Sequence, residues 1–155
     1  MPQNPFVHLH CHTDYSLLDG ACEIGQLMDT VVEQKMPAVA MTDHGNLFGA
    51  VKFYNTAKSK GVHPVIGCEV YVSQQGHKTR NDTDRYNHLI LLCETQEGYR
   101  NLINLVSTGF LEGFSTTSPA STRTCWRFNL VPAGGTGRSC LRRLPACADG
   151  GITVQ

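Results

Sequence analysis

The first 114 residues alternate between short, continuous apolar runs and longer stretches in which apolar residues recur every three or four positions. The continuous runs are typical of strands, and they predict strands at residues 5–10, 38–41, 62–72 and 88–94. The recurring spacing is typical of amphipathic helices, and it predicts helices at residues 23–35, 47–60 and 96–106. This alternation predicts an α/β fold with mainly parallel strands.

The second expected helix has an apolar stripe along one face. Its inner face is expected to hold Phe48, Val51, Phe53, Tyr54 and Ala57. A polar stretch at 73–87, rich in glycine, asparagine and charge, predicts a loop or an exposed hairpin tip.

The chain changes character near Phe114. Its formal net charge is zero, but residues 1–114 carry a net charge of −4 and residues 115–155 a net charge of +4. The later part is rich in serine and threonine and has no sustained amphipathic period, so an irregular or disordered tail is expected at 115–155. Residues 1–114 are expected to form the ordered portion.

Bulk properties exclude several classes of protein. Zero net charge offers no general argument for nucleic-acid or membrane binding. No basic, apolar leader precedes the first histidine, and no apolar stretch is long enough to span a bilayer. The seven cysteines lack paired CxxC spacing, which indicates reduced thiols and predicts a cytoplasmic location.

Three histidines stand at alternating positions near the N-terminus: His8, His10 and His12. In an extended strand alternate side chains share a face, so the imidazoles are expected to lie on one side. Asp14 and Asp19 follow closely. Imidazole with a nearby carboxylate suits a divalent cation, which favours a metal site over a histidine-rich surface strand or a tag remnant.

Further candidate ligands occur at or near the ends of other expected strands. His44 follows the second strand directly, and Asp43 beside it is expected either to ligate or to orient an imidazole. Glu69 interrupts an apolar strand, where a carboxylate is costly unless it is paired or bound to a cation. His88 begins a strand, and its spacing in the sequence favours neither a metal ligand nor a residue outside the site. His63 and His77 are expected to be bystanders, and Cys11 is expected to point into the core.

The number of histidine and carboxylate candidates exceeds the number of ligands that one zinc ion needs. Two or more ions a few ångströms apart suit phosphoester hydrolysis. No glycine-rich phosphate loop and no serine nucleophile elbow is found in the sequence. The residues alone therefore predict a metal-dependent, phosphoesterase-like α/β domain.

Three stretches resemble a known family: FVHLHCHTDYSLLDG, MTDHGNLFGAVKFYNTAKSKGVHPVIGCEVYV and NHLILLCETQEGYRNLINLVSTGFLEGF. They are similar to the start of bacterial DNA polymerase III alpha subunits, which is a PHP (polymerase and histidinol phosphatase) domain. The resemblance covers about residues 4–114. It implies the first part of a distorted (β/α)7 barrel that is incomplete here, with up to three metals at its strand ends. The metal ligands that it implies are His10, His12, Asp19, His44, Glu69 and His88.

The resemblance also implies a parent function. The parent would be a DNA-directed DNA polymerase in replication that works with primer-template DNA, deoxynucleotides, a sliding clamp and other replicase subunits, and not with membranes. Its PHP site would bind zinc, manganese or iron and support 3′–5′ exonuclease chemistry in some members. The palm is absent from this chain, which alone cannot polymerise DNA. The alternatives are a stand-alone PHP phosphoesterase and a non-catalytic structural PHP scaffold.

The tail suggests a shifted reading frame. Codons can be chosen for residues 115–127 so that translation from their third base gives the peptide YYKPRIDKNLLA. This peptide resembles the sequence that polymerase relatives carry after FLEGF. Because these codons are chosen and not observed, the match is a hypothesis. It predicts that residues after Phe114 are out of frame.

Overall fold

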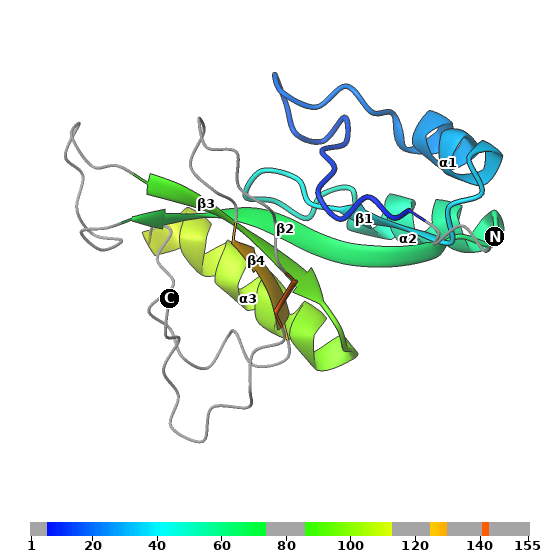
Figure 1. The fold of residues 1–155 in the computed structure, drawn as a ribbon. Coiled ribbons are helices and arrows are strands. Elements are labelled where there is room, and N and C mark those ends of the chain that lie inside the picture. The colour runs from blue at the N-terminus through cyan, green and yellow to red at the C-terminus, as the bar shows by residue number, and fades with distance from the viewer. Residues whose placement is uncertain (1–5, 74–85, 113–124, 130–140, 143–155) are drawn as a thin grey trace.

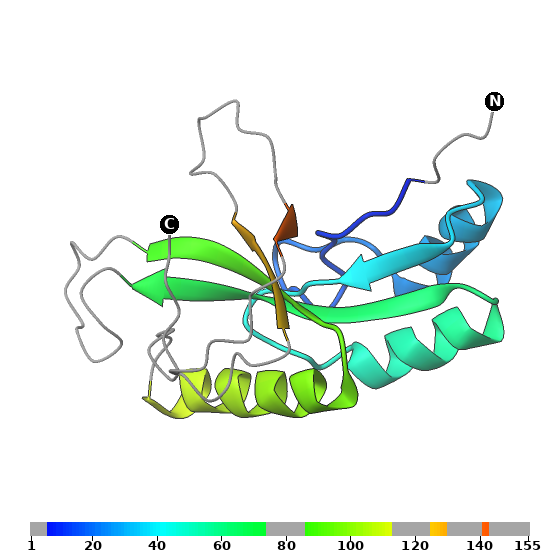
Figure 2. The same cartoon turned by 60° about the horizontal axis from the view of Figure 1, so that its bottom comes forward.

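The computed structural model describes residues 6–73, 86–112, 125–129 and 141–142. Its elements, in chain order, are α1 (Ile24–Glu33), β1 (Ala38–Met41), α2 (Ala50–Ser59), β2 (His63–Ser73), β3 (Tyr86–Cys93), α3 (Gln96–Glu112), β4 (Cys125–Asn129) and β5 (Leu141–Arg142). The fold is therefore α/β, with three helices against one small mixed sheet (Figures 1 and 2). Within these ranges no helix is long and apolar enough to cross a membrane.

The five strands are ordered β1-β2-β3-β4-β5, and only β1 and β2 are parallel. β2 and β3 pair antiparallel, as do β3 with β4 and β4 with β5. The expectation of mainly parallel strands was wrong. The helix α2 connects β1 to β2, which allows these two strands to run parallel. No helix was expected between β2 and β3, and neighbouring strands joined without a crossover helix pair antiparallel.

Most predicted elements are confirmed within a few residues, but the expected strand at 5–10 is not. His8 makes only an isolated parallel bridge to Val39. The segment nevertheless follows β1, because Ala40 N donates to His8 O at 2.8 Å and Thr42 N donates to Cys11 O at 2.9 Å. β1 has only four residues, which leaves little edge for a regular ladder.

α2 and α3 lie end to end along one face of the sheet, and α1 packs against α2 beside β1 (Figure 2). One core cluster joins α1, β1 and α2 around Met28, Met41 and Phe53, and a second joins β2, β3 and α3 around Val70, Leu91 and Leu102. The opposite face carries a smaller apolar cluster of Ala40, Ile90 and Leu92. Glu69 points to this second face, because it alternates with Cys68 and Val70 along β2.

The stripe expected on the second helix was partly wrong. Phe53 and Ala57 are fully buried, but Phe48, Val51 and Tyr54 are exposed by 70%, 69% and 47%. The helix begins at Ala50, so Phe48 lies in the preceding turn. Positions 50, 53 and 57 form one helical face, and Val51 and Tyr54 point beside it.

Two strands lie where an irregular tail was expected. β4 pairs with β3 from Leu89↔Asn129 to Cys93↔Cys125, and β5 pairs with β4. The sequence CWRFN places aromatic residues at alternate positions, which is typical of a strand, and β3 offers a free edge for it. The absence of a helical period did not exclude such pairing. The loop expected at 73–87 lies almost wholly outside the described residues.

Candidate metal centre

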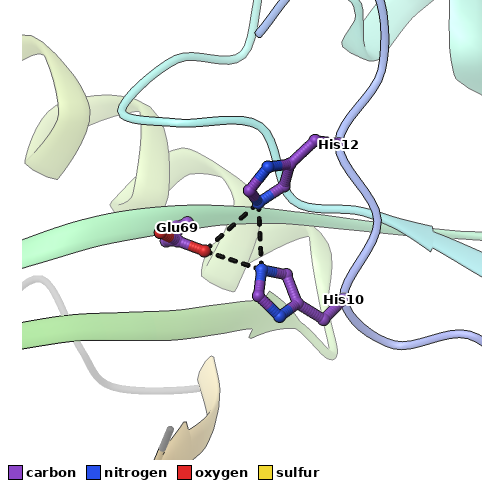
Figure 3. Close-up of side chains that lie close together, drawn as sticks. All are labelled: His10, His12 and Glu69. Atoms are coloured by element: carbon purple, nitrogen blue, oxygen red, sulfur yellow. Dashed lines mark hydrogen bonds and ion pairs between the residues drawn. The ribbon is translucent and has the colours of Figure 1, made fainter. Parts of the chain in front are cut away.

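The strongest candidate site lies where the segment carrying His10 and His12 passes the middle of β2. Figure 3 shows both imidazoles pointing at the carboxylate of Glu69. His10 Nε2 lies 2.6 Å from Glu69 Oε2 and 2.9 Å from His12 Nε2, and His12 Nε2 lies 3.2 Å from the same oxygen. Three atoms with metal-binding lone pairs therefore converge on one small volume.

A second set of candidate ligands adjoins the first through His44. His44 Nδ1 lies 3.1 Å from Glu69 Oε1, and His88 Nδ1 is in close contact with the same oxygen. On its other side His44 Nε2 contacts Asp19 Oδ2, which is also 3.5 Å from His12 Nδ1. Two further groups thus form, His44 with Glu69 and His88, and His12 with Asp19 and His44.

The chain's path explains this convergence. His44 follows β1 and its backbone pairs with Glu69 in a parallel bridge. The following residue, Gly45, has φ of +59°, a backbone conformation that suits glycine and lets the chain turn close to the site. His88 sits near the start of β3, opposite Tyr71 of β2, so antiparallel pairing brings it beside Glu69.

Glu69 is the buried centre of the site, with a side chain only 1% exposed. Burial raises the pKa of this carboxyl, but the hydrogen bond of His10 and the charges of His44, His88 and His10 outweigh burial and lower it to about 2. Its Oε1 atom makes no hydrogen bond of acceptable geometry, although two imidazole nitrogens lie close to it. A buried oxygen in this state is costly in a protein without a further partner.

Asp19 lies at the solvent side of the site, with a side chain 64% exposed. The hydrogen bond and charge of His44 lower the pKa of Asp19. The turn that carries it is tight: Asp19 N and Gly20 N both donate to Ser16 O, and a Cβ on Gly20 would lie 1.9 Å from Thr13 O.

Tyr71 is a site residue that the sequence analysis did not identify. Its hydroxyl lies 3.1 Å from His44 Nδ1, its ring stacks parallel to that of His44, and it meets the His88 ring edge-on at 5.1 Å between centroids. The available signal was its position two residues after Glu69, which places both side chains on one face of a strand.

Asp43 does not join any of the three groups, although the sequence suggested that it would ligate or orient an imidazole. It is fully buried and accepts hydrogen bonds from Thr13 N at 2.6 Å, Thr13 Oγ1 at 2.7 Å and Ser16 Oγ at 2.7 Å. His44 N donates to the same Ser16 Oγ at 3.1 Å. Asp43 therefore fastens the turn that carries Asp19 to the backbone at His44.

The remaining candidates lie apart from the site. His8 is exposed and packs edge-on against Phe6 and belongs to no group of candidate ligands, so the three alternating histidines do not act together. His63 is exposed at the start of β2, and His77 lies outside the described residues. Cys11 is only partly buried and lies beside Cys22, so the expectation of a core cysteine was wrong.

The donor set fits a divalent cation. Ligand atoms about 2.1 Å from one ion in tetrahedral geometry lie about 3.4 Å apart. The atoms of the His10, His12 and Glu69 group are spaced at 2.6 to 3.2 Å, so a small outward relaxation would accommodate an ion. Imidazole nitrogen with carboxylate oxygen is a set that zinc, manganese and iron accept.

Comparisons with known proteins agree with this chemistry. The family model described as "PHP domain" matches residues 8–133. The DNA polymerase III subunit alpha of Chlamydia trachomatis is 51% identical over 112 residues, covering 70% of this chain and 9% of that protein. The corresponding subunit of Aquifex aeolicus is 47% identical over 117 residues, covering 70% of this chain and 10% of that protein. The chain thus spans about a tenth of the length of these relatives.

Two solved structures resemble the chain more distantly. A putative metal-dependent phosphoesterase from Bifidobacterium adolescentis is 18% identical, with a TM-score of 0.47 over 72% of this chain and 36% of that one. An amidohydrolase from Chromobacterium violaceum, with bound sulfate and no metal, is 24% identical, with a TM-score of 0.49 over 68% of this chain and 34% of that one.

Proposed function

Because this chain belongs to the PHP domain family, in the form found in DNA polymerase III alpha subunits, we propose that it is part of such a subunit and binds divalent metal ions. The observation that carries the proposal is the convergence of His10, His12 and Glu69 on one small volume, with the second oxygen of the buried carboxylate beside the imidazoles of His44 and His88. Surface histidines without a ligand role would not meet at a buried carboxylate, because burying it is costly.

Six residues form the proposed ligand set: His10, His12, Asp19, His44, Glu69 and His88. A neutral imidazole has one free lone pair, so His12 and His44 can each serve one ion at a time. Glu69 has two oxygens that face different histidines, which suits a carboxylate bridging two ions. His10 and His12 would hold one ion together with Glu69, and His88 would hold a second ion together with Glu69. His44 either joins His88 or pairs with Asp19.

The chemistry that suits this site is phosphoester hydrolysis, with 3′–5′ exonuclease activity in the intact parent as the specific form. Two divalent ions would supply Lewis acidity to a phosphate ester and activate water. The protein would contribute orientation: Asp19 holds the outer nitrogen of His44, and the Tyr71 hydroxyl faces its inner nitrogen. A carboxylate or hydroxyl on a ligand histidine fixes its tautomer and ring angle.

The polymerase role belongs to the parent. The relatives are about ten times longer than the matched region, and a parent of that kind would add nucleotides to a DNA primer in the cytoplasm. Its partners would be primer-template DNA, deoxynucleotides, a sliding clamp and other replicase subunits. This chain would be the first part of an incomplete PHP barrel. We also propose that the native frame ends near Phe114, because the matches to these relatives cover only about 70% of this chain, although the family model continues to residue 133.

Metal titration of the 155-residue chain tests the ligand assignment. Zinc, manganese and iron(II) are titrated into the chelator-treated protein by calorimetry, with His10→Ala and His12→Ala as test variants. His63→Ala is the matched control, because His63 is exposed on β2 and belongs to no ligand group. Each test variant is expected to lose 10-fold or more in affinity for the tightest metal, and the control is expected to keep the original affinity.

Unchanged binding in both test variants would refute the ligand assignment. Intact metal binding with no hydrolysis of a 3′-terminal phosphodiester by the full-length parent would favour the non-catalytic scaffold over the exonuclease. Genomic DNA across the codon for Phe114 tests the frame: polymerase-like sequence in another frame supports the shift, and its absence contradicts it.

A further inference from the structure

His44 belongs to two of the candidate ligand groups, and its two ring nitrogens face different groups. Nε2 contacts Asp19 Oδ2, whereas Nδ1 lies 3.1 Å from Glu69 Oε1, the oxygen that His88 also contacts. A neutral imidazole offers a metal ion only one lone pair at a time. A neighbour that engages one of the two nitrogens therefore decides which group His44 joins.

Tyr71 engages the inner nitrogen of His44. Its hydroxyl makes a hydrogen bond with Nδ1 at 3.1 Å, and the two rings stack with an angle of 2° between their planes and 6.2 Å between their centroids. Glu69 Oε1 is equally far from Nδ1, but it makes no hydrogen bond of acceptable geometry. The tyrosine hydroxyl is therefore the better-directed of these two oxygens toward Nδ1.

We propose that Tyr71 is a positioning residue whose hydroxyl occupies Nδ1 of His44 and leaves Nε2 as the nitrogen that binds a metal ion beside Asp19. The inference rests on the proposed function, because it concerns the metal ions proposed for this site. It assigns His44 to the ion on the Asp19 side and not to the ion that Glu69 would hold through Oε1. A hydroxyl on the far nitrogen of a ligand histidine fixes the orientation of the ring.

The sheet holds the Tyr71 hydroxyl in place. Tyr71 lies on β2, directly opposite His88 of β3, and its ring meets the His88 ring edge-on at 5.1 Å between centroids. The backbone of His44 is tied to the same strand by its parallel bridge to Glu69. Asp19, in contrast, lies on a turn and has a side chain that is 64% exposed. Of the two partners of the His44 ring, Tyr71 is therefore the one on a rigid element.

A hydroxyl suits this role because it can both donate and accept a hydrogen bond. Without a metal ion, the Asp19 carboxylate accepts the proton of Nε2, and the Tyr71 hydroxyl donates to the lone pair of Nδ1. When Nε2 gives its lone pair to an ion, the ring proton is on Nδ1 and is donated to the same hydroxyl oxygen. Proton exchange with water converts one tautomer into the other, so Tyr71 can stay in place in both states.

Nuclear magnetic resonance with cadmium tests which nitrogen of His44 binds the ion. The chelator-treated 155-residue chain is loaded with a spin-active isotope of cadmium, and couplings between the metal and the ring protons of His44 are measured. Cadmium on Nε2 couples to both Hδ2 and Hε1, because both carbons adjoin that nitrogen, whereas cadmium on Nδ1 couples to Hε1 alone. The original protein is expected to show both couplings, and a His44→Gln variant identifies the signals.

Tyr71→Phe removes the hydroxyl and keeps the stacked ring. It is expected to weaken cadmium binding about 10-fold and to add a form of the protein with cadmium on Nδ1 of His44. Tyr54→Phe is the matched control, because Tyr54 is exposed on α2, and it is expected to change neither the affinity nor the couplings. A purely structural loss would lower stability without changing the nitrogen that binds the ion.

The inference is overturned if cadmium in the original protein couples to Hε1 of His44 alone, or if it binds without coupling to His44. It is also overturned if Tyr71→Phe leaves both the affinity and the couplings unchanged. Failure of the proposed function is a different result: the original protein would then bind no cadmium, zinc, manganese or iron(II), and the inference would fall with it.

Discussion

Replacing Asp43 by asparagine perturbs the junction between the Asp19 turn and the backbone at His44. The side chain is fully buried and accepts three hydrogen bonds, from Thr13 N, Thr13 Oγ1 and Ser16 Oγ, at 2.6 to 2.7 Å. Asparagine is nearly isosteric, so the substitution creates no cavity. It replaces one accepting oxygen with an NH2 group and removes the charge that strengthens all three bonds.

The magnitude follows from these three bonds. A hydrogen bond to a charged group contributes about 1.5–3 kcal/mol and a neutral one about 0.5–1.5 kcal/mol. Thr13 Oγ1 can turn to accept from the new NH2 group, but its own hydroxyl hydrogen then loses the acceptor that Asp43 Oδ2 supplied. Loss of charge assistance at three bonds then costs about 3 kcal/mol in the free energy of unfolding. Asp43→Ala should cost more, because it strands three buried donors.

The assay is urea unfolding of the chelator-treated 155-residue chain, followed by circular dichroism. Asp29→Asn is the matched control, since Asp29 is an exposed carboxylate of α1 paired with Lys60. The control is expected to change the free energy of unfolding by less than about 1 kcal/mol, as for other surface ion pairs. Thr13→Val should couple to Asp43→Asn in a double-mutant cycle, because both remove the same hydrogen bond.

An Asp43→Asn variant no less stable than Asp29→Asn would refute this reasoning. It would mean that the three short hydrogen bonds stabilise the folded protein no more than water stabilises the same groups in the unfolded chain. Additivity of the Thr13 and Asp43 substitutions would also contradict it, because the two side chains would then act independently.

Three further predictions follow from the site and its turns. Gly20→Ala should lower the free energy of unfolding, measured in urea, by about 2–4 kcal/mol, because its Cβ would lie 1.9 Å from Thr13 O. Gly61 has φ of +74° but open space around it, so Gly61→Ala should lower the free energy of unfolding by only about 1 kcal/mol. The folded-state pKa of Glu69 is depressed to about 2, so its contribution to stability is present above its ordinary value near 4.5 and is lost as the pH falls from there toward 2. In the metal-free protein Glu69→Gln should therefore flatten the fall in stability over that window, and an unchanged slope would contradict the assignment. Metal affinity measured by calorimetry should weaken as the solution is made more acidic, because protons compete with the metal for the lone pairs of imidazole ligands; a pH-independent affinity would argue against histidine ligation.

The helices and the central strands follow from local patterns. Three-and-four spacing places Ile24, Met28 and Val31 on one face of α1, and the run at 38–41 forms β1 as expected. These features depend on neighbours within a few residues, so periodicity suffices to predict them.

What the sequence could not determine depends on how distant segments meet. Nothing local distinguishes His8 from His10; only the path of the chain past Glu69 excludes the first and includes the second. The position of Asp43 beside His44 suggests a ligand. In the structure, however, Thr13 and Ser16 lie against Asp43 and donate hydrogen bonds to both of its carboxylate oxygens. The backbone of Cys22 likewise meets that of Thr13 only because the chain brings two separate segments together in a bridge. Residue type and local period thus predicted the helices, the central strands and the candidate ligands of this protein. Which side chains share a site was decided by the tertiary structure, because short-range contacts select among candidates that are equivalent in sequence.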